Sequence, residues 1–222
     1  MNGLSEFIKR LFTSIILLGC FGGAYLHSTA LFCVFLGIVL ALILMFEWPH
    51  LAPPTQPLFW FLTAFYPIMP MAALFWLTIT FRHTDFWLPL YPFFVAWTSD
   101  TCGYMTGKLF GRHKMYPSLS PGKSWEGFAG SVLGVIAIHF IMIPNMQMFH
   151  KLLASTAPWS VLALAIIMTT VSVTGGFFLS FLKRRQNLKD AGTVLPGHGG
   201  FLDRFDGVFF VAVATIILYL CL

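Results

Sequence analysis

Long apolar stretches alternate with short polar ones along the chain. Charged residues are absent from seven of these stretches, at 11–27, 30–46, 57–81, 86–98, 127–143, 159–182 and 207–222. A helix needs about 20 apolar residues to cross the roughly 30 Å hydrocarbon core of a bilayer, and most of the stretches reach or approach that length. The pattern therefore predicts an all-α, polytopic transmembrane helical protein with about seven spans, within a range of six to nine.

Two stretches depart from the simple pattern. The stretch 86–98 is short, and we expect its helix to continue into the polar residues that follow. The stretch 57–81 contains Pro67 and Pro70. Because proline lacks a backbone N–H donor and its ring clashes with the preceding turn, we expect a kink or a break there.

The composition is that of a membrane protein. Of the 222 residues, 58% are hydrophobic and only 9% are charged, whereas a soluble domain carries about 25% charged residues. So few charges could not cover a water-facing surface, which excludes the ordinary soluble classes. The cysteines Cys20, Cys33, Cys102 and Cys221 have no metal-ligand spacing, so we expect small buried side chains and no disulfide framework.

Basic residues gather at the N-terminus and in two polar loops. Of the 13 Lys and Arg residues, 11 lie at Lys9 and Arg10, in the loop 100–126 or in the loop 183–206. The positive-inside rule places such clusters on the cytoplasmic side, and an even number of predicted spans separates each cluster from the next. Because topology and anionic lipid head groups account for the net charge of +5, we expect no nucleic-acid partner.

The second loop begins with groups that suit phosphate binding. On a helix, Ser180, Lys183 and Arg184 would share one face. A hydroxyl group and two positive charges on that face can hold a phosphate. The glycine-rich turn 196–200 would also let backbone N–H groups approach a ligand closely.

The same loop ends with a pair of carboxylates. Asp203 and Asp206 stand three residues apart just before the last apolar stretch, and beside basic groups they can hold a divalent cation against phosphates. Each feature alone has an ordinary explanation: a basic run can be a topology signal, glycines a turn, an Asp pair a helix cap and His198 a loop histidine. Their joint order is the specific signal.

That order resembles the signature of the phosphatidate cytidylyltransferase family. The family pattern runs Ser, Lys-Arg, Lys-Asp, Pro-Gly-His-Gly-Gly and Asp-Arg-x-Asp, and its spacing matches throughout. In this chain its members are Ser180, Lys183-Arg184, Lys189-Asp190, Pro196-Gly197-His198-Gly199-Gly200 and Asp203-Arg204-Phe205-Asp206.

The first loop is similar to the family as well, with Ser99-Asp100-Thr101 and the segment 120–127, so the resemblance covers about residues 95–210. Gly122 and Ser124 replace a lysine and a threonine of the family pattern. Many bacterial members have Gly-Asp where this chain has Gly175-Gly176. The change leaves open which carboxylate completes a metal site here, with Asp100 and Asp190 as the candidates.

The resemblance implies transfer of a cytidylyl group from CTP to phosphatidate, which gives CDP-diacylglycerol and pyrophosphate. It implies Mg²⁺ as cofactor, with a second, monovalent cation as a further expectation. The implied partners are CTP, phosphatidate, membrane lipid and a second copy in a homodimer. We expect a bacterial inner (cytoplasmic) membrane protein with its active site facing the cytoplasm. Residues 1–98 would form N-terminal transmembrane helices, and residues 99–222 a catalytic membrane domain with two cytoplasmic motif loops.

The resemblance also assigns roles to individual residues. Catalytic roles fall to Asp203, Asp206, Lys183 and Arg184, metal binding to Asp203, Asp190 and Asp100, and substrate binding to Lys123, Ser180, Lys189, His198, Gly199, Gly200 and Arg204.

Two other functions stay open on sequence alone. A CTP-dependent lipid-alcohol kinase would need a general base for a hydroxyl group, for which Asp190 is a candidate. A membrane transporter would carry ionisable side chains inside its spans. The apolar stretches hold no charged residue, and His139 is the only imidazole well inside one, which counts against transport.

The clustering of basic residues predicts that both loops face the cytoplasm. In a background without the four native cysteines, single cysteines at positions 115 and 193 should react with a membrane-impermeant maleimide only from the cytoplasmic side. The measurement uses sealed vesicles of known orientation. Labelling of either position from the outer side would contradict this topology.

Overall fold

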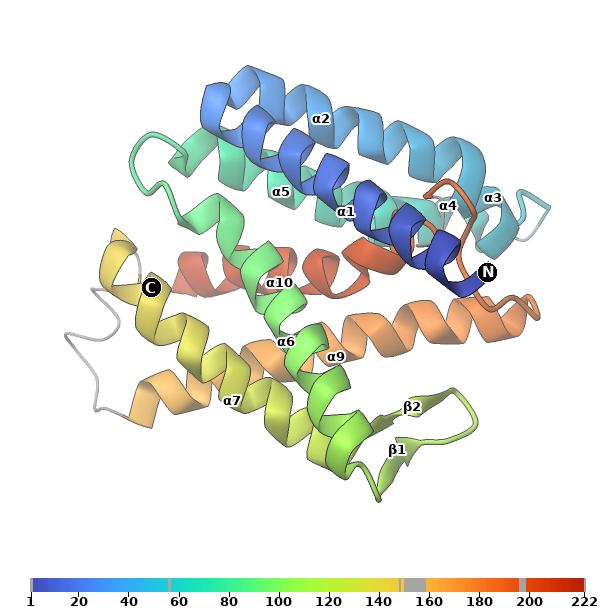
Figure 1. Cartoon of the computed structure of the whole chain (residues 1–222). Helices are drawn as coiled ribbons and strands as arrows, with labels where there is room; N and C mark the ends of the chain where they lie inside the picture. The colour runs from blue at the N-terminus through green and yellow to red at the C-terminus, as the bar shows by residue number, and fades with distance from the viewer. Residues whose placement is uncertain (1, 56, 148, 150–158, 196–198, 222) are drawn as a thin grey trace. The chain divides into compact units, whose positions relative to one another are not determined.

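The computed structural model describes residues 2–55, 57–147, 149, 159–195 and 199–221, and for residues 2–11 it describes the backbone alone. This part of the chain is mostly helical, with one short β-hairpin (Figure 1). Its longer elements in chain order are α1 (Asn2–His27), α2 (Thr29–Leu42), η1 (Ile43–Glu47), α3 (Trp48–Leu51), α4 (Phe59–Thr63), η2 (Ala64–Ile68), α5 (Met69–Phe81), α6 (Tyr91–Phe110), β1 (Lys114–Tyr116), β2 (Ser120–Ser124), α7 (Trp125–Met142), α9 (Trp159–Arg185) and α10 (Leu202–Cys221). Two short 3₁₀ turns, η3 (Leu88–Leu90) and η4 (Ile143–Asn145), precede α6 and follow α7.

The predicted apolar stretches all fall on helices. Five helical segments of the described chain are long and apolar enough to cross a membrane: Thr29–Leu51, Phe59–Phe81, Trp125–Asn145, Trp159–Arg185 and Leu202–Cys221. Helices α1 and α6 account for the other two stretches, and α6 continues into the polar residues after position 98 as expected. The all-α, polytopic architecture is confirmed.

Two of the spans accommodate prolines through a wider turn. In η1, just before Pro49, the N–H of Trp48 donates to the carbonyl of Ile43, five residues back. In η2, which contains Pro67, the same five-residue pattern recurs. A π-helical turn takes up a residue that cannot donate a hydrogen bond. Of the two expected alternatives between residues 57 and 81, the break is absent, since α4, η2 and α5 form one span, with the π-helical turn at Pro67 inside it.

Backbone contacts divide the chain into two compact units. Unit 1 comprises Met1–Ile79 and Leu182–Phe205, and unit 2 comprises Thr80–Phe181 and Asp206–Leu222. Helices α9 and α10 each begin in one unit and end in the other. The functional division into residues 1–98 and 99–222 stays a prediction.

Unit 1 contains the helix pair α1 and α2, which lie side by side (Figure 1). Ser28 separates the two helices, and its Oγ accepts the N–H of Leu31 at 3.1 Å to cap α2. Phe32 is fully buried between the helices, with the rings of Phe21 and Tyr25 edge-on at 5.3 and 4.9 Å. Aromatic packing therefore holds the pair together.

Unit 2 is organised by a close contact between α6 and α7, with the antiparallel β1–β2 hairpin between them in the chain (Figure 1). A Cβ at Gly127 would lie only 2.8 Å from the backbone oxygen of Gly103. The Oγ of Ser131 donates to the carbonyl of Ser99 at 2.6 Å. Small residues at this crossing let the two backbones approach, as in many membrane helix pairs.

The buried imidazole of unit 2 has a structural partner. The Nε2 atom of His139 on α7 lies 2.9 Å from the hydroxyl group of Tyr91 on α6, and both side chains are fully buried. An interhelical hydrogen bond of this kind stabilises a helix pair in an apolar environment. His139 therefore has a structural explanation and does not need a transport pathway.

The α6–α7 contact generates a stability prediction. Gly127→Ala should destabilise the protein by about 1–3 kcal/mol, because the added methyl group meets backbone that cannot move away. The measurement is the thermal unfolding midpoint in detergent. Gly22→Ala on α1 is the matched control, since a Cβ there meets nothing within 4 Å. Equal unfolding midpoints for the two variants would contradict the close contact.

Candidate active site

The second motif loop begins at a defined end of α9. Asn187 has a φ of 56°, in the left-handed region. The N–H of Leu188 donates to the carbonyl of Lys183 at 2.8 Å, and the N–H of Asn187 to that of Arg184 at 3.1 Å. This pair of bonds is a Schellman stop. The Schellman stop fixes the last turn of α9. The Arg184 guanidinium adds a side-chain hydrogen bond, which it donates to the Leu188 carbonyl at 3.3 Å.

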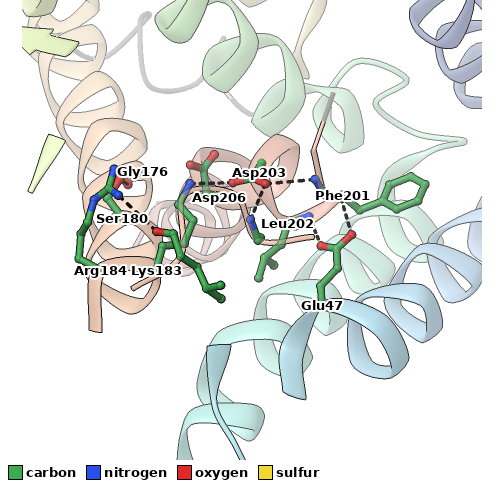
Figure 2. A network of polar contacts seen from close by, with 12 residues as sticks. Glu47, Gly176, Ser180, Lys183, Arg184, Phe201, Leu202, Asp203 and Asp206 are labelled. Atoms are coloured by element: carbon green, nitrogen blue, oxygen red, sulfur yellow. Dashed lines mark hydrogen bonds and ion pairs between the residues drawn. The ribbon is translucent and has the colours of Figure 1, made fainter. Parts of the chain in front are cut away.

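Asp203, in the first turn of α10, ties the loop together (Figure 2). Its Oδ1 accepts a hydrogen bond from the Lys183 ammonium at 2.7 Å. Its Oδ2 accepts hydrogen bonds from the backbone N–H groups of Ala191 at 2.8 Å and Gly200 at 3.1 Å. The Lys183 and Asp203 side chains are only 15% and 11% exposed. Removing one partner would leave a poorly hydrated charge, so the pair constrains both ends of the loop.

Glu47 supports the same loop from η1. The side chain is 0% exposed, and its two oxygens accept the N–H groups of Phe201 at 2.7 Å and Leu202 at 2.8 Å (Figure 2). N–H groups at the start of a helix have no acceptor within that helix, and negative charge is favourable there. Glu47 thus caps α10 from a segment far away in the sequence.

The glycines of the loop make room for these carboxylates. A Cβ at Gly200 would lie 2.6 Å from Glu47 Oε2, and one at Gly192 would lie 2.7 Å from Glu47 Cγ. Gly199 has a φ of 81°, which a residue with a side chain rarely adopts. The sequence predicts that this turn offers N–H groups to a substrate. In the structure, the Gly200 N–H is donated to Asp203.

Asp190 and Asp203 are close neighbours. A methyl group placed on Gly199 would lie 3.1 Å from Asp203 Oδ2 and 3.8 Å from Asp190 Cγ. The described residues contain no group of three or more His, Cys, Asp or Glu side chains that could hold a metal by themselves. Mg²⁺, however, often binds one or two carboxylates together with waters and substrate phosphates. The Asp190 and Asp203 pair is a candidate for that second type of site.

Unit 2 holds a separate group of predicted site residues around a hollow of about 290 Å³. Asp100 from α6 and Lys123 from β2 both line it. The Lys123 ammonium donates to the Val173 carbonyl at 3.2 Å and lies 4.6 Å from the centre of the Phe177 ring. The hollow therefore combines the Asp100 carboxylate with the Lys123 ammonium, which its two contacts hold in place.

Gly176 on α9 lies against the Lys123 ammonium. A Cβ at Gly176 would contact the Lys123 Nζ atom and would lie 3.4 Å from Asp206 Oδ2. Lys123 and Asp206, from motifs far apart in the sequence, thus meet where residue 176 lacks a side chain. An aspartate there, as in many bacterial members of the resembled family, would face a positive charge.

Other residues of the first motif serve local structure. The Oγ of Ser124 accepts the N–H of Gly127 at 3.1 Å and caps α7. The Glu126 carboxylate accepts the N–H of Arg112 at 3.1 Å and lies 2.6 Å from the His113 ring nitrogen Nδ1. These contacts hold the end of α6 against the start of α7.

The predicted site residues divide between the two units. Unit 1 contains Lys183, Arg184, Lys189, Asp190, Gly199, Gly200, Asp203 and Arg204, and unit 2 contains Asp100, Lys123, Ser180 and Asp206. Lys189 and Arg204 are exposed. The Ser180 hydroxyl donates to the Gly176 carbonyl of its own helix at 2.7 Å. His198 lies outside the described residues. The catalytic and binding roles of all these residues stay predictions.

Glu47 is the site residue that the sequence analysis missed. It stands one position beyond the apolar stretch 30–46, but the helical span continues to Leu51. The apolar stretch is free of charge, but the helical span that it predicts is not, because Thr29–Leu51 includes Glu47. A usable signal was present, because Glu47 is the only acidic residue between Glu6 and Asp85. An isolated carboxylate in a membrane helix indicates a buried polar partner.

Fold and site together define a polytopic α-helical membrane protein with paired carboxylates and basic side chains at its helix ends. Comparison with known proteins identifies the family. Residues 11–222 match the model of the cytidylyltransferase family, and the chain belongs to that family. The expected family is confirmed.

Several bacterial proteins named phosphatidate cytidylyltransferase are similar to this chain. The Rickettsia conorii protein is 30% identical over 218 residues, which cover 97% of this chain and 91% of the relative. The Haemophilus influenzae protein is 33% identical over 176 residues, covering 76% of this chain and 60% of the relative. The Staphylococcus epidermidis protein is 40% identical over 122 residues, covering 55% of this chain and 45% of the relative. The region matched to this chain thus spans less than half the length of the Staphylococcus epidermidis protein.

The contacts of Glu47 predict that its removal lowers the stability of the protein. Glu47→Ala leaves two N–H groups at the start of α10 without their acceptor, so we expect a loss of about 2–5 kcal/mol in unfolding free energy. Glu47→Gln keeps one carbonyl acceptor and should retain part of that stability. The measurement is the thermal unfolding midpoint of the purified protein. An Ala variant that unfolds at the parent midpoint would contradict the capping role.

Proposed function

We propose that this protein transfers a cytidylyl group from CTP to phosphatidate, giving CDP-diacylglycerol and pyrophosphate in phospholipid biosynthesis. The observation that carries the proposal is the shielded Lys183–Asp203 pair beside Asp190, in a chain whose family match extends over residues 11–222. Similar proteins that carry the name phosphatidate cytidylyltransferase support the same activity.

The reaction needs two polyanions to be brought together. An oxygen of the phosphatidate phosphate attacks the α-phosphorus of CTP, the bond to the β-phosphate oxygen breaks, and pyrophosphate leaves with the electron pair. The attacking phosphate is already a nucleophile, so no base is required and catalysis consists of positioning and charge stabilisation. Lys183, Arg184 and Arg204 would bind phosphates at the α9–α10 loop, and Lys123 would bind one in its own hollow.

The cofactor we propose is Mg²⁺, with a second, monovalent cation, to neutralise phosphate charge. Asp190 and Asp203 are the carboxylates that would hold it, because they are neighbours and offer hard anionic oxygens. Asp100, in unit 2, remains the third candidate. Asp203 also accepts hydrogen bonds from two backbone N–H groups, so it would position the loop as well as the ion.

The two alternative functions are not favoured. The relatives are named for cytidylyl transfer, which does not support a lipid-alcohol kinase with Asp190 as its base. A transporter would need an ionisable group available within a span. The Glu47 carboxylate accepts two backbone N–H groups, and the His139 ring contacts Tyr91.

We further propose a bacterial inner membrane location with the motif loops in the cytoplasm, where CTP is available. Phosphatidate would keep its acyl chains in the bilayer while its head group reaches the site. A homodimer is also proposed, on the resemblance to the family alone.

The direct test incubates the purified protein with CTP, phosphatidate and Mg²⁺ and measures CDP-diacylglycerol and pyrophosphate in equal amounts. A parallel reaction supplies diacylglycerol in place of phosphatidate. Formation of phosphatidate from diacylglycerol and CTP, with no CDP-diacylglycerol from phosphatidate, would show a kinase and overturn the proposal.

The metal assignment predicts different effects for the two neighbouring carboxylates. Asp190→Asn should raise the Mg²⁺ concentration for half-maximal turnover by about tenfold, roughly 1.4 kcal/mol, and leave the unfolding midpoint unchanged because Asp190 is exposed. Asp203→Asn should lower both turnover and the unfolding midpoint, since it also removes the Lys183 pair. An Asp190→Asn protein with parental Mg²⁺ dependence would remove Asp190 from the metal site.

A further inference from the structure

Beside the Lys123 hollow, unit 2 contains an open groove of about 300 Å³ that the proposed mechanism does not use. It is formed between the hairpin region and α9 by Met115, Tyr116, Leu119, Trp125, Phe177 and Phe181. Tyr116, Trp125 and Phe181 are 56, 57 and 50% exposed. Together with Phe177 they give the groove a mainly aromatic lining, which suits an apolar ligand.

The groove lies beside the Lys123 hollow. Met115 lines both cavities. Phe177 forms a wall of the groove, and its ring lies 4.6 Å from the Lys123 ammonium. The Lys123 ammonium thus lies against one aromatic wall of the groove. A ligand that fills both cavities has an anionic head and a long apolar tail.

The lining chemistry argues against a nucleobase in the groove. Base recognition requires hydrogen-bonding groups directed at the base edge. Of the lining side chains, only Tyr116 and Trp125 carry an O–H or N–H group, and the others are apolar. Tyr and Trp are also the side chains that favour the boundary between lipid and water.

We propose that this groove binds an acyl chain of the lipid substrate while its phosphate lies at Lys123. The proposal rests on the proposed function for the identity of the lipid, and it adds where the tail binds. It assigns Tyr116, Phe177 and Phe181 to lipid recognition. The consequence is a dependence of turnover on acyl-chain length that is encoded in the hairpin and α9.

The first test compares dioleoyl-phosphatidate with dioctanoyl-phosphatidate in uncharged mixed micelles at saturating CTP. Phe181→Ala should lower the ratio of kcat/KM for the long lipid to that for the short lipid by about fivefold to tenfold. A separate CTP titration with each lipid should give an unchanged KM for CTP. Phe140→Ala on α7 is the matched control, since Phe140 is 68% exposed and lies outside the groove. Equal ratios for the two variants would overturn the proposal. A raised KM for CTP with both lipids would assign the groove to the nucleotide instead.

The second test does not depend on turnover or on a variant. Phosphatidate with a diazirine on its acyl chain is photolysed with the parent protein in the same micelles, and the adducts are mapped by peptide mass spectrometry. We expect adducts at residues 115–125 or 177–181, reduced by excess dioleoyl-phosphatidate. Adducts confined to other helices would overturn the groove assignment. If these adducts form but no CDP-diacylglycerol is made, the proposed function fails while the lipid groove stands.

Discussion

Two backbone N–H groups at the start of α10 have no acceptor in their own helix, and the buried carboxylate of Glu47 accepts both. Away from water, an unsatisfied N–H group is costly, so this contact constrains where α10 begins. The start of α10 in turn places Asp203, whose carboxylate holds Lys183 and the N–H groups of Ala191 and Gly200. The geometry of the second motif loop therefore depends on a residue outside that motif.

Several motif residues serve structure and chemistry at once. Asp203 has the charge and the neighbour, Asp190, that a metal site needs, yet it also closes the loop through backbone contacts. Gly176 leaves the space that the Lys123 ammonium occupies beside Asp206. An activity loss on mutation of such a residue does not by itself identify a catalytic group. Stability has to be measured alongside turnover to separate the two contributions.

The helices were predictable because long apolar stretches are a strong, local signal, and all seven stretches proved helical. The π-helical turns at the prolines were not predictable from the sequence, since their hydrogen bonds depend on the surrounding helix. The motif order predicted a metal site of Asp203, Asp190 and Asp100; Asp190 and Asp203 both lie beside Gly199 in unit 1, and Asp100 belongs to unit 2. It did not predict Glu47, because that contact joins positions 154 residues apart and leaves no local pattern.

The long sequence separation of the Glu47 contact has a consequence for biosynthesis. A chain made from its N-terminus inserts α2 and η1 well before Phe201 and Leu202 exist. During that interval the Glu47 carboxylate lacks the two N–H donors that it has in the finished fold, and an unpaired polar group is costly away from water. Formation of the α10 start then supplies both donors, so the second motif loop is completed late in folding. Chains that stall before this step would keep an unpaired carboxylate within a helical span, which is costly in a membrane.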